Sequence, residues 1–550
     1  MAVKQKDHGQ VGGTCGFPTP QSPYYHVRFS FSLEGDGRYQ INRVKVNGQR
    51  VRDFAAYYNF SFQKDQLLKP GGMSELVVRW DWKPRERCEV EVSGEGPREK
   101  ESFTLKGSVD APDHGGYWNP AWKHYASLVL TETAGVDREN EPVHTSLAVY
   151  GDRIQDPARE LRIVAVDPRT GAHLEIPCQV HEVARYTAEG MEIGEEYQPT
   201  TTFQFAFLAD VPADSSRVYL AFYGNQGAKA TAYLSSLSVS GEKLGLAIEN
   251  PFYRTILSSK SGAIDEIHVK MGVNQKIEHH LETNGALHWN PCFYCPPRPW
   301  LHASDWDPPP QSSWFSGPVF LATTRSGHVD PYREESHMAV TYRFYDKVPW
   351  IFVSTKLEVR KDVATKALRN GEFVVNRKLV EEFAWRKPDG TAGTMFITDG
   401  PRHPRHAKVL PADTPWACFF SRKGRFGLGM VNIKLADFRA DGGLAKLCNR
   451  YSYLQWGKWA YYARPLVYTF ASNNPARLVP VPAGNVYYEE MAVLPLRIDP
   501  EGEDFRQLEI LHQKLVHPLD LQLVEDTDPR APEGWVPPVL VQEFEEMDDE

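Results

Sequence analysis

The sequence predicts an all-β protein, with N-terminal β-sandwich domains followed by a large antiparallel β-layered domain. Apolar and polar residues alternate in many short runs, of which Tyr25–Leu33 is a clear example, and this alternation is typical of strands with one buried face. The chain has 41 glycines and 41 prolines, which supply turns between such runs. The clearest helical spacing of apolar residues is confined to Glu503–Leu515.

Composition sets the broad class of the protein. With 550 residues, 41% of them hydrophobic and 24% charged, the chain has material for several domains or one large multi-layer unit. The net charge is -9 and no Lys/Arg-rich run interleaves with aromatics, so nucleic acid is not an expected partner. No apolar run reaches the ~18 residues of a membrane span. The N-terminus lacks the apolar core of a signal peptide, so we expect a cytoplasmic location, or secretion if a signal has been removed.

The order of these patterns predicts four segments. Residues 1–121 form a β-sandwich with a connector, 122–245 a second β-sandwich, 246–520 the large β-domain, and 521–550 a proline-rich and acidic tail. The third segment has longer strand-like runs with more aromatic residues than the first two. Such runs along the chain include Ile41–Val46, Cys88–Ser93, Glu101–Val109, Ser127–Thr131, Thr202–Leu208, Met338–Tyr345, Trp350–Glu358 and Val486–Leu496.

A motif at the start of the large domain resembles a known family. The run Asn250–Ile267 reads N-P-F-Y-R-T-I-L-S-S-K-S-G-A-I-D-E-I. It resembles the first strands of galactose-mutarotase-like domains, in which a strand with N-x-x-Y-R-V is followed by a K-S-G turn and a strand with I-x-x-I. The segments Arg138–Val143 and Phe207–Asn225 resemble the accessory β-sandwich that precedes this domain in some such enzymes.

The resemblance implies that residues 246–520 form a β-supersandwich and that the protein acts on carbohydrates. Domains of this kind occur in several polysaccharide lyases and glycosidases. The helical toroid of many supersandwich lyases is absent here, because residues 1–245 have the pattern of β-structure. No single family, and no family set of catalytic residues, follows from the resemblance.

The most informative segment for function is Glu282–Asp307. It contains three tryptophans, a tyrosine, two histidines, an arginine, two aspartates and four prolines. Proline stiffens the chain, so polar groups are held in place at low entropic cost. Flat aromatic faces beside fixed hydrogen-bonding groups suit a sugar ring, so we expect a polysaccharide or oligosaccharide as substrate. The alternative is a structural loop whose tryptophans bury against the sheet.

The residue types in this segment favour a lyase that cleaves a uronic-acid-containing glycan by β-elimination. Such an enzyme needs a group that neutralises the uronate carboxylate and a base within reach of the C5 proton. Asn284 and Arg298 could neutralise, and His288 or Tyr294 could act as base. The full set of catalytic candidates is His288, Tyr294, Asn284, Arg298, His302 and Glu382. The candidates for substrate binding are Trp289, Asn290, Trp300, Asp305, Trp306, Arg402, His403, Trp456 and Lys458.

Four of the substrate-binding candidates lie outside the segment. Arg402 and His403 belong to the run P-R-H-P-R-H, which could bind a carboxylate or sulfate through arginine or form an exposed basic turn. Trp456 and Lys458 belong to the aromatic run Tyr451–Pro465. In a strand these two residues share one face, which could stack against a sugar or pack into the core.

Two other functions stay open at the level of sequence. A glycoside hydrolase would use two carboxylates, drawn from Glu372, Glu382 and Asp305. A non-catalytic glycan-binding protein would use the same aromatic residues without perturbed acids. Assays for the unsaturated product of elimination, for reducing sugars and for glycan binding discriminate the three.

No cofactor and no metal site is predicted, although the residue types leave a divalent cation open. Cys292 and Cys295 form a C-x-x-C motif without the second pair that a zinc site would need, and free thiols or a local disulfide are the expectation. His403 and His406 lack a clear third ligand. Seven cysteines over this length do not form a disulfide scaffold, and the oligomeric state does not follow from the sequence.

Overall fold

The chain is all-β, as predicted, and consists of two compact units. Unit 1 comprises Met1–Ala232 and Leu519–Glu550, and unit 2 comprises Tyr233–Pro518. Within the described residues there are two α-helices and one 3-10 turn, and none of the helices is long and apolar enough to cross a membrane. The computed structural model describes residues 11–16, 25–31, 37–52, 54–58, 61–70, 74–80, 87–96, 102–110, 118–119, 121–167, 172–186, 200–270, 275–278, 287–397, 408–439, 441–443, 445, 451–456, 460–468, 477–499 and 505–525.

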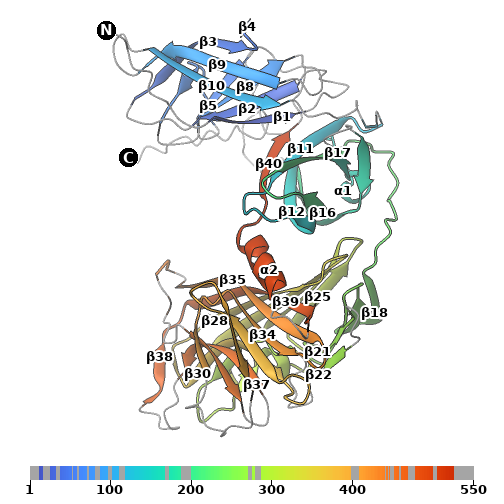
Figure 1. The fold of residues 1–550 in the computed structure, drawn as a ribbon, viewed down its shortest axis with the longest axis vertical. Helices are drawn as coiled ribbons and strands as arrows, with labels where there is room; N and C mark the ends of the chain where they lie inside the picture. Colours follow the sequence, from blue (N-terminus) through green and yellow to red (C-terminus); the bar gives the residue numbers. More distant parts are fainter. Residues whose placement is uncertain are drawn as a thin grey trace. The chain divides into compact units, whose positions relative to one another are not determined.

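The first part of unit 1 is a pair of antiparallel sheets (Figure 1). Along β3 (Tyr39–Val46), Val44 and Val46 are fully buried while Lys45 between them is half-buried, as expected for a strand with one face on a core. One sheet has the order β1 (Val11–Gly16), β2 (Tyr25–Phe31), β8 (Ser74–Trp80), β5 (Phe54–Tyr58), β6 (Ser61–Phe62). The other has the order β10 (Ser102–Asp110), β9 (Arg87–Glu95), β3, β4 (Gln49–Val51), with β7 (Leu67–Leu68) paired to β3.

The second part of unit 1 holds two more antiparallel sheets and includes a strand from the far end of the chain. Phe203, Phe205 and Phe207 are buried at every second position of one long strand. Strand β40 (Asp520–Glu525) pairs with β11 (His124–Thr131), so the first residues of the predicted tail are part of this strand. The sheet orders are β14 (His173–Ile176), β13 (Arg162–Val166), β17 (Ser216–Tyr223), β11, β40, and β12 (Arg138–Tyr150), β16 (Thr200–Val211), β15 (Cys178–Tyr186), with α1 (Pro157–Glu160) before β13.

A buried, ion-paired carboxylate joins two loops of unit 1. Arg138 Nη2 lies 2.8 Å from Glu132 Oε1, and both side chains are 0% exposed. Glu132 also accepts hydrogen bonds from backbone amides of residues 134–136 and of Asp214. Burial opposes its ionisation, but Arg138 and these amides lower the pKa of Glu132 to about 2. The carboxylate therefore ties the β11–β12 loop to the β16–β17 loop.

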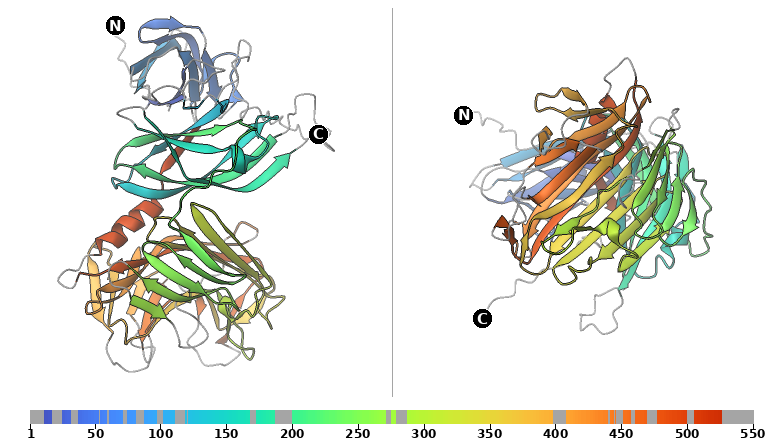
Figure 2. Two further views of the ribbon diagram at one scale, coloured as in Figure 1. Left: turned by 90° about the vertical axis from the view of Figure 1, so that its right-hand side faces the viewer. Right: turned by 90° about the horizontal axis from the view of Figure 1, so that it is seen from below.

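Unit 2 is built from larger antiparallel sheets, and Figure 2 shows its long strands from two further directions. A five-stranded sheet has the order β18 (Ser238–Glu242), β19 (Gly245–Glu249), β20 (Tyr253–Leu257), β21 (Ile264–Val269), β22 (Gln275–Glu278). A six-stranded sheet has the order β24 (Leu301–His302), β23 (Cys292–Tyr294), β30 (Ala367–Val375), β37 (Ala460–Tyr468), β36 (Tyr451–Trp456), β33 (Lys408–Pro411). A nine-stranded sheet has the order β25 (Gln311–Ser316), β26 (Phe320–Gly327), β27 (Ser336–Tyr345), β28 (Ile351–Val359), β39 (Asn485–Arg497), β35 (Phe426–Arg439), β34 (Trp416–Ser421), β31 (Glu382–Arg386), β32 (Ala392–Phe396). A separate two-stranded sheet is formed by β29 (Val363–Thr365) and β38 (Val479–Val481).

The core of unit 2 lies between the six-stranded and nine-stranded sheets. Phe373 of β30 stacks on Phe419 of β34 with ring centroids 6.1 Å apart, and Tyr462 of β37 contacts Phe383 of β31 at 5.9 Å. Because side chains alternate along a strand, the residues next to Phe373 and Tyr462 point to the opposite face of the six-stranded sheet. That opposite face carries the candidate site described below.

The motif that suggested the supersandwich has a structural role at the start of unit 2. The side-chain amide of Asn250 donates to the carbonyls of Tyr345 and Val348, and its oxygen accepts from the amides of Phe252 and Tyr253. A single buried asparagine thus fixes the start of β20 against the end of β27. The helix predicted over Glu503–Leu515 is α2 (Arg506–Val516), which packs on β34 and β35.

We predict that Glu132→Gln lowers the free energy of unfolding of unit 1 by about 3–5 kcal/mol, because the buried Arg138 loses its partner at 2.8 Å and keeps only the longer contact with Glu141 at 3.5 Å. The matched control is Glu91→Gln, which removes a partly exposed carboxylate paired with Lys45 and Lys106 and should cost less than about 1 kcal/mol. Urea unfolding measures the free energy of unfolding of both variants. Equal losses would contradict a stabilising role for the buried pair.

The same pair gives a pH dependence. The folded pKa of Glu132, about 2, lies below the ordinary 4.5, so its stabilisation is complete above the ordinary value and is lost as the pH falls towards 2. The wild-type protein should lose stability relative to Glu132→Gln over this range. If the free energy of unfolding fell equally with pH in the two proteins, the prediction would be contradicted.

Candidate functional site

Two histidines and a glutamate meet beside β30, whose strand is labelled in Figure 1. His288 Nε2 lies 3.7 Å from Glu372 Oε1, and the rings of His288 and His302 meet edge to face with centroids 4.6 Å apart. One potential ligand atom from each of the three residues lies within 4.8 Å of the others. We refer to these three residues as the histidine–glutamate cluster.

Strand register brings the cluster and its neighbours together. His302 of β24 lies opposite Cys292 of β23, which lies opposite Arg369 of β30. Glu372 of β30 and Tyr453 of β36 lie opposite the same residue of β37. Directly opposed residues of antiparallel neighbours project from the same face of a sheet. The register therefore collects residues from four strands on one face.

A β-bulge places Arg369 and Glu372 on that same face. Three positions apart in a regular strand, they would point to opposite faces. The pairing of β30 with β37 shifts register on both sides of Arg369, the second time before Gly371, and such an irregularity adds a residue to one strand and re-aims its side chains. Arg369 Nη1 consequently reaches Glu372 Oε2 at 2.6 Å.

A glycine lets the His288 segment approach β30. A Cβ atom at Gly371 would lie 2.7 Å from Trp289 Cα and 2.9 Å from Asn290 N, so a side chain at this position would clash with backbone. Because the two segments are this close, the amide of Glu372 donates to the carbonyl of His288 at 3.0 Å. Two members of the cluster are thus joined through their backbones.

Arg369 is the buried cation of the site. Its side chain is 8% exposed, Nη1 also donates to Tyr453 Oη at 3.4 Å, and its guanidinium lies 4.5 Å from the centroid of the Trp300 ring. Burial alone would lower the pKa of Arg369, but the charge of Glu372 raises it well above its ordinary value. Arg369 therefore stays charged beside Glu372.

A short turn fixes the outer nitrogens of both imidazoles. His302 Nδ1 lies 3.2 Å from Asp305 Oδ2, and the amide of His302 donates to the same oxygen at 2.8 Å. Burial opposes ionisation of Asp305, but the hydrogen bonds from His302 hold the pKa of that carboxyl below its usual value. Ser304, in the same turn, places its Oγ 3.1 Å from His288 Nδ1.

An aromatic stack lies beside the cluster. Trp300 stacks on Tyr294 with ring centroids 5.0 Å apart and lies 6.2 Å from the ring of His302. Trp300 and Tyr294 are both half-buried. Of the predicted residues, Trp300, Tyr294, His302, Asp305 and His288 are therefore brought together.

Other predicted residues of the segment are part of the interior. Trp289 is fully buried and stacks on Tyr462 at 6.0 Å. Trp306 is 5% exposed, and its indole N–H donates to the carbonyl of His328 at 2.7 Å. Asn290 is fully buried, and its oxygen accepts from Arg325 at 2.9 Å. These side chains hold the segment against the sheets.

Arg298 and Glu382 lie in ion pairs outside the cluster. Arg298 Nη1 is 2.7 Å from Glu335 Oε1, and its guanidinium lies over the ring of Tyr332 at 4.3 Å. Glu382, on β31 of the nine-stranded sheet, is 3.0 Å from Arg422 Nε. Cys292 and Cys295 are free and buried, and burial raises the pKa of both thiols.

Some predicted residues lie outside the part of the chain that the structure describes. Asn284, Arg402, His403 and Lys458 are not described, and of Trp456 only the backbone in β36 is.

Sequence reasoning missed three residues of the site and weighed Glu372 only as a hydrolase carboxylate. Arg369 and Tyr453 lie on strands far from Glu282–Asp307, and Ser304 was not singled out within that segment. A signal existed in β30, because the polar run R-N-G-E interrupts an otherwise apolar strand (Ala367–Val375). Buried charges within such a strand are almost always paired.

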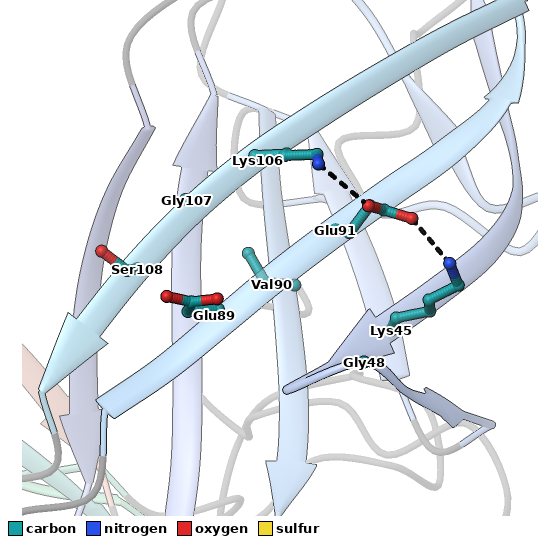
Figure 3. Close-up of a pocket in the computed structure, with 8 residues that line it drawn as sticks. All are labelled: Lys45, Gly48, Glu89, Val90, Glu91, Lys106, Gly107 and Ser108. Carbon is teal, nitrogen blue, oxygen red and sulfur yellow. Dashed lines mark hydrogen bonds and ion pairs between the residues drawn. The ribbon is translucent and has the colours of Figure 1, made fainter.

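Unit 1 has a hollow of its own, which Figure 3 shows. It measures about 510 Å³ and lies on β3, β9 and β10. Glu91 is held there between Lys45 at 2.9 Å and Lys106 at 3.2 Å, and hydrogen bonds from these lysines lower its pKa. The lining residues include no aromatic ring and no histidine, so this hollow offers neither sugar stacking nor a base near neutral pH.

Comparisons with known proteins give similarities of fold. No family model and no curated protein matches the chain. Among solved structures, an α-mannosidase from Enterococcus faecalis V583 is similar with a TM-score of 0.46 and 9% identity, over 74% of this chain and 46% of that one. This chain therefore spans less than half the length of that protein.

Two further similar structures are of the galactose-mutarotase-like class that Asn250–Ile267 resembles. A galactose mutarotase related enzyme from Lactobacillus acidophilus has a TM-score of 0.29 and 7% identity, over 46% of this chain and 97% of that one. A galactose mutarotase-like protein from Lactobacillus casei ATCC 334 has a TM-score of 0.30 and 10% identity, over 47% and 100%. The mannosidase and mutarotase activities are those of the similar proteins.

We predict that Arg369→Met costs about 3–5 kcal/mol of unfolding free energy, because it leaves Glu372 buried without its countercharge. The double variant Arg369→Met with Glu372→Gln should recover part of this loss, since neither charge then remains. Urea unfolding of these two variants and of Glu372→Gln alone measures the coupling. Arg298→Met, which breaks a more exposed pair, is the control and should cost about 1 kcal/mol or less. If the loss of unfolding free energy in the double variant equalled the sum of the losses in the two single variants, the two residues would not be coupled.

Proposed function

We propose that this protein is a carbohydrate-active enzyme and, more specifically, a lyase that cleaves a uronic-acid-containing glycan by β-elimination. The observation that carries the proposal is the histidine–glutamate cluster, with its three potential ligand atoms within 4.8 Å of one another, next to the half-buried stack of Trp300 on Tyr294. An aromatic face binds the apolar side of a sugar ring, and the cluster supplies polar groups at its edge.

Elimination makes two demands on the site. The uronate carboxylate must be neutralised so that the C5 proton becomes acidic, and a base must take that proton. The C4–O4 bond then breaks, a C4=C5 double bond forms, and the leaving sugar oxygen receives a proton. Positive charge to neutralise the carboxylate can be supplied by a cation held between the members of the cluster.

We assign the base to Tyr453 rather than to His288. The two ring nitrogens of His288 face Ser304 and Glu372, so both are already engaged within the cluster. Tyr453 Oη accepts a hydrogen bond from Arg369, and a guanidinium beside a phenol oxygen stabilises the phenolate that a base requires. Tyr453 can then pass the proton from C5 to the leaving oxygen.

The carboxylates of the site fit a glycoside hydrolase less well. A hydrolase of the usual kind needs one protonated carboxyl group and one carboxylate across the scissile bond. Glu372 is ion-paired with Arg369, the pKa of Asp305 is lowered, and Glu382 lies on the other large sheet. The lowered pKa of Asp305 disfavours the protonated acid that hydrolysis requires, and the two glutamates do not face each other across one site.

We predict that the protein releases unsaturated uronate products from a polysaccharide such as polygalacturonate, alginate or a glycosaminoglycan. Ultraviolet absorbance of the C4=C5 bond measures them. Tyr453→Phe should lower kcat by about 10²–10⁴-fold, whereas the control Tyr488→Phe, on β39 of the nine-stranded sheet, should leave kcat unchanged. Release of reducing sugar without absorbance would make the protein a hydrolase. Glycan binding without either would make it a binding protein.

Trp300→Ala should weaken glycan binding by about 5–10-fold, because an aromatic contact contributes about 1 kcal/mol beyond its buried area. Trp314→Ala is the matched control, since Trp314 is an exposed tryptophan on β25 of the other large sheet. Isothermal titration with oligosaccharide measures both. If only the Trp314 variant lost affinity, the glycan site would have to be moved to β25.

A further inference from the structure

We infer that His288, His302 and Glu372 bind a divalent transition-metal cation, for which Zn²⁺ is the best fit. Two imidazoles and one carboxylate are a common ligand set for zinc sites that keep a position open for water or substrate. Imidazole also selects Zn²⁺ and its first-row neighbours over Ca²⁺ and Mg²⁺, which prefer oxygen ligands. The inference extends the proposed function, but it is tested by binding alone.

The spacing of the three residues suits one shared ion. Ligand atoms that bind Zn²⁺ tetrahedrally at about 2.0–2.1 Å lie about 3.3–3.4 Å from one another. His288 Nε2 and Glu372 Oε1 are 3.7 Å apart, and no pair of the three ligand atoms is separated by more than 4.8 Å. Small side-chain rotations therefore bring all three to coordinating distance.

Each ligand has a supporting contact of the kind that metal sites use. In such sites the outer imidazole nitrogen is bonded to a carboxylate, carbonyl or hydroxyl, which fixes the tautomer that offers its lone pair to the ion. In this protein, Asp305 is the hydrogen-bond partner of His302 Nδ1, and Ser304 is the partner of His288 Nδ1. Arg369 bonds Oε2 of Glu372, which leaves Oε1 directed at His288.

The remaining nitrogen of His302 strengthens the case. His302 Nε2 is buried, and within the described part of the chain it has no hydrogen-bond partner. An imidazole nitrogen buried in this way costs free energy unless something satisfies it. A cation between His302 and Glu372 would do so.

The charge of the site also favours a divalent ion. With neutral imidazoles, the ligands and their supports carry one positive group, Arg369, and two negative groups, Glu372 and Asp305. Their net charge of −1 would repel a uronate. A divalent ion changes it to +1, so that one substrate carboxylate makes the assembly neutral. The ion would then be the group that neutralises the uronate, which leaves Tyr453 as base.

Backbone contacts hold the ligands in place before any ion arrives. His288 and Glu372 share a backbone hydrogen bond of 3.0 Å, and His302 is placed by pairing of β24 with β23. A site with little reorganisation to undergo binds its ion more tightly. The outward-facing pair of His337 and Glu358, 3.8 Å apart, provides a histidine and a carboxylate outside the cluster and serves as a control.

The test uses the full chain, treated with a chelator and dialysed, then titrated with Zn²⁺, Co²⁺, Mn²⁺ and Ca²⁺ by calorimetry and metal analysis. We expect one equivalent of Zn²⁺ or Co²⁺, a visible absorption spectrum from the Co²⁺ form, and much weaker binding of Ca²⁺. His302→Ala and Glu372→Gln should lose at least about 100-fold in affinity. Asp305→Asn should lose about 10–100-fold, as expected for a support of a ligand, and His337→Ala should bind like the wild type.

Absence of stoichiometric binding in the wild type, or undiminished binding by a folded His302→Ala variant, would overturn the inference. Circular dichroism establishes that the variants are folded. The inference and the lyase assignment can fail separately. Metal binding without elimination would reject only the lyase, and elimination at full rate by the chelated, metal-free protein would reject only a role for the ion.

Discussion

The ion pair between Arg369 and Glu372 is the interaction on which the candidate site depends. Both residues lie in β30, in the middle of the six-stranded sheet, and both are buried. Without the bulge they would point to opposite faces, and each would be an unpaired buried charge. The bulge places both side chains on one face, so that they pair and the Glu372 carboxylate is held in place. Gly371 allows the His288 segment to lie directly against the strand.

From this pair the two faces of the six-stranded sheet acquire different roles. Phe373 and Tyr462 pack against the nine-stranded sheet, and this apolar layer covers one face of β30 and β37. The opposite face carries the histidine–glutamate cluster and the aromatic stack. A site supported by strands that are themselves held by a core keeps its geometry better than one formed by loops alone. Because side chains alternate along a strand, one face of the six-stranded sheet packs into the core and the other carries the candidate site.

The sequence predicted the fold class well because strand alternation is a local property, visible in Tyr25–Leu33 as in the long strands of unit 2. It also selected the segment that supplies His288, Trp300 and His302. It did not separate the tryptophans that bury, such as Trp289, from Trp300, because that depends on which sheet each meets. Pairing of Arg369 with Glu372 depends on a bulge defined by β37, about 95 residues away, and no local pattern specifies such a register.

We propose above that this site removes the proton from C5 of a uronic acid. The most direct measurement is the rate of cleavage of an oligosaccharide that carries deuterium at C5, compared with the same oligosaccharide carrying hydrogen. We expect a severalfold slower reaction with deuterium, loss of the label from the sugar, and a new vinylic proton signal in the product. Cleavage at equal rates to a saturated sugar that keeps its deuterium would contradict the proposal.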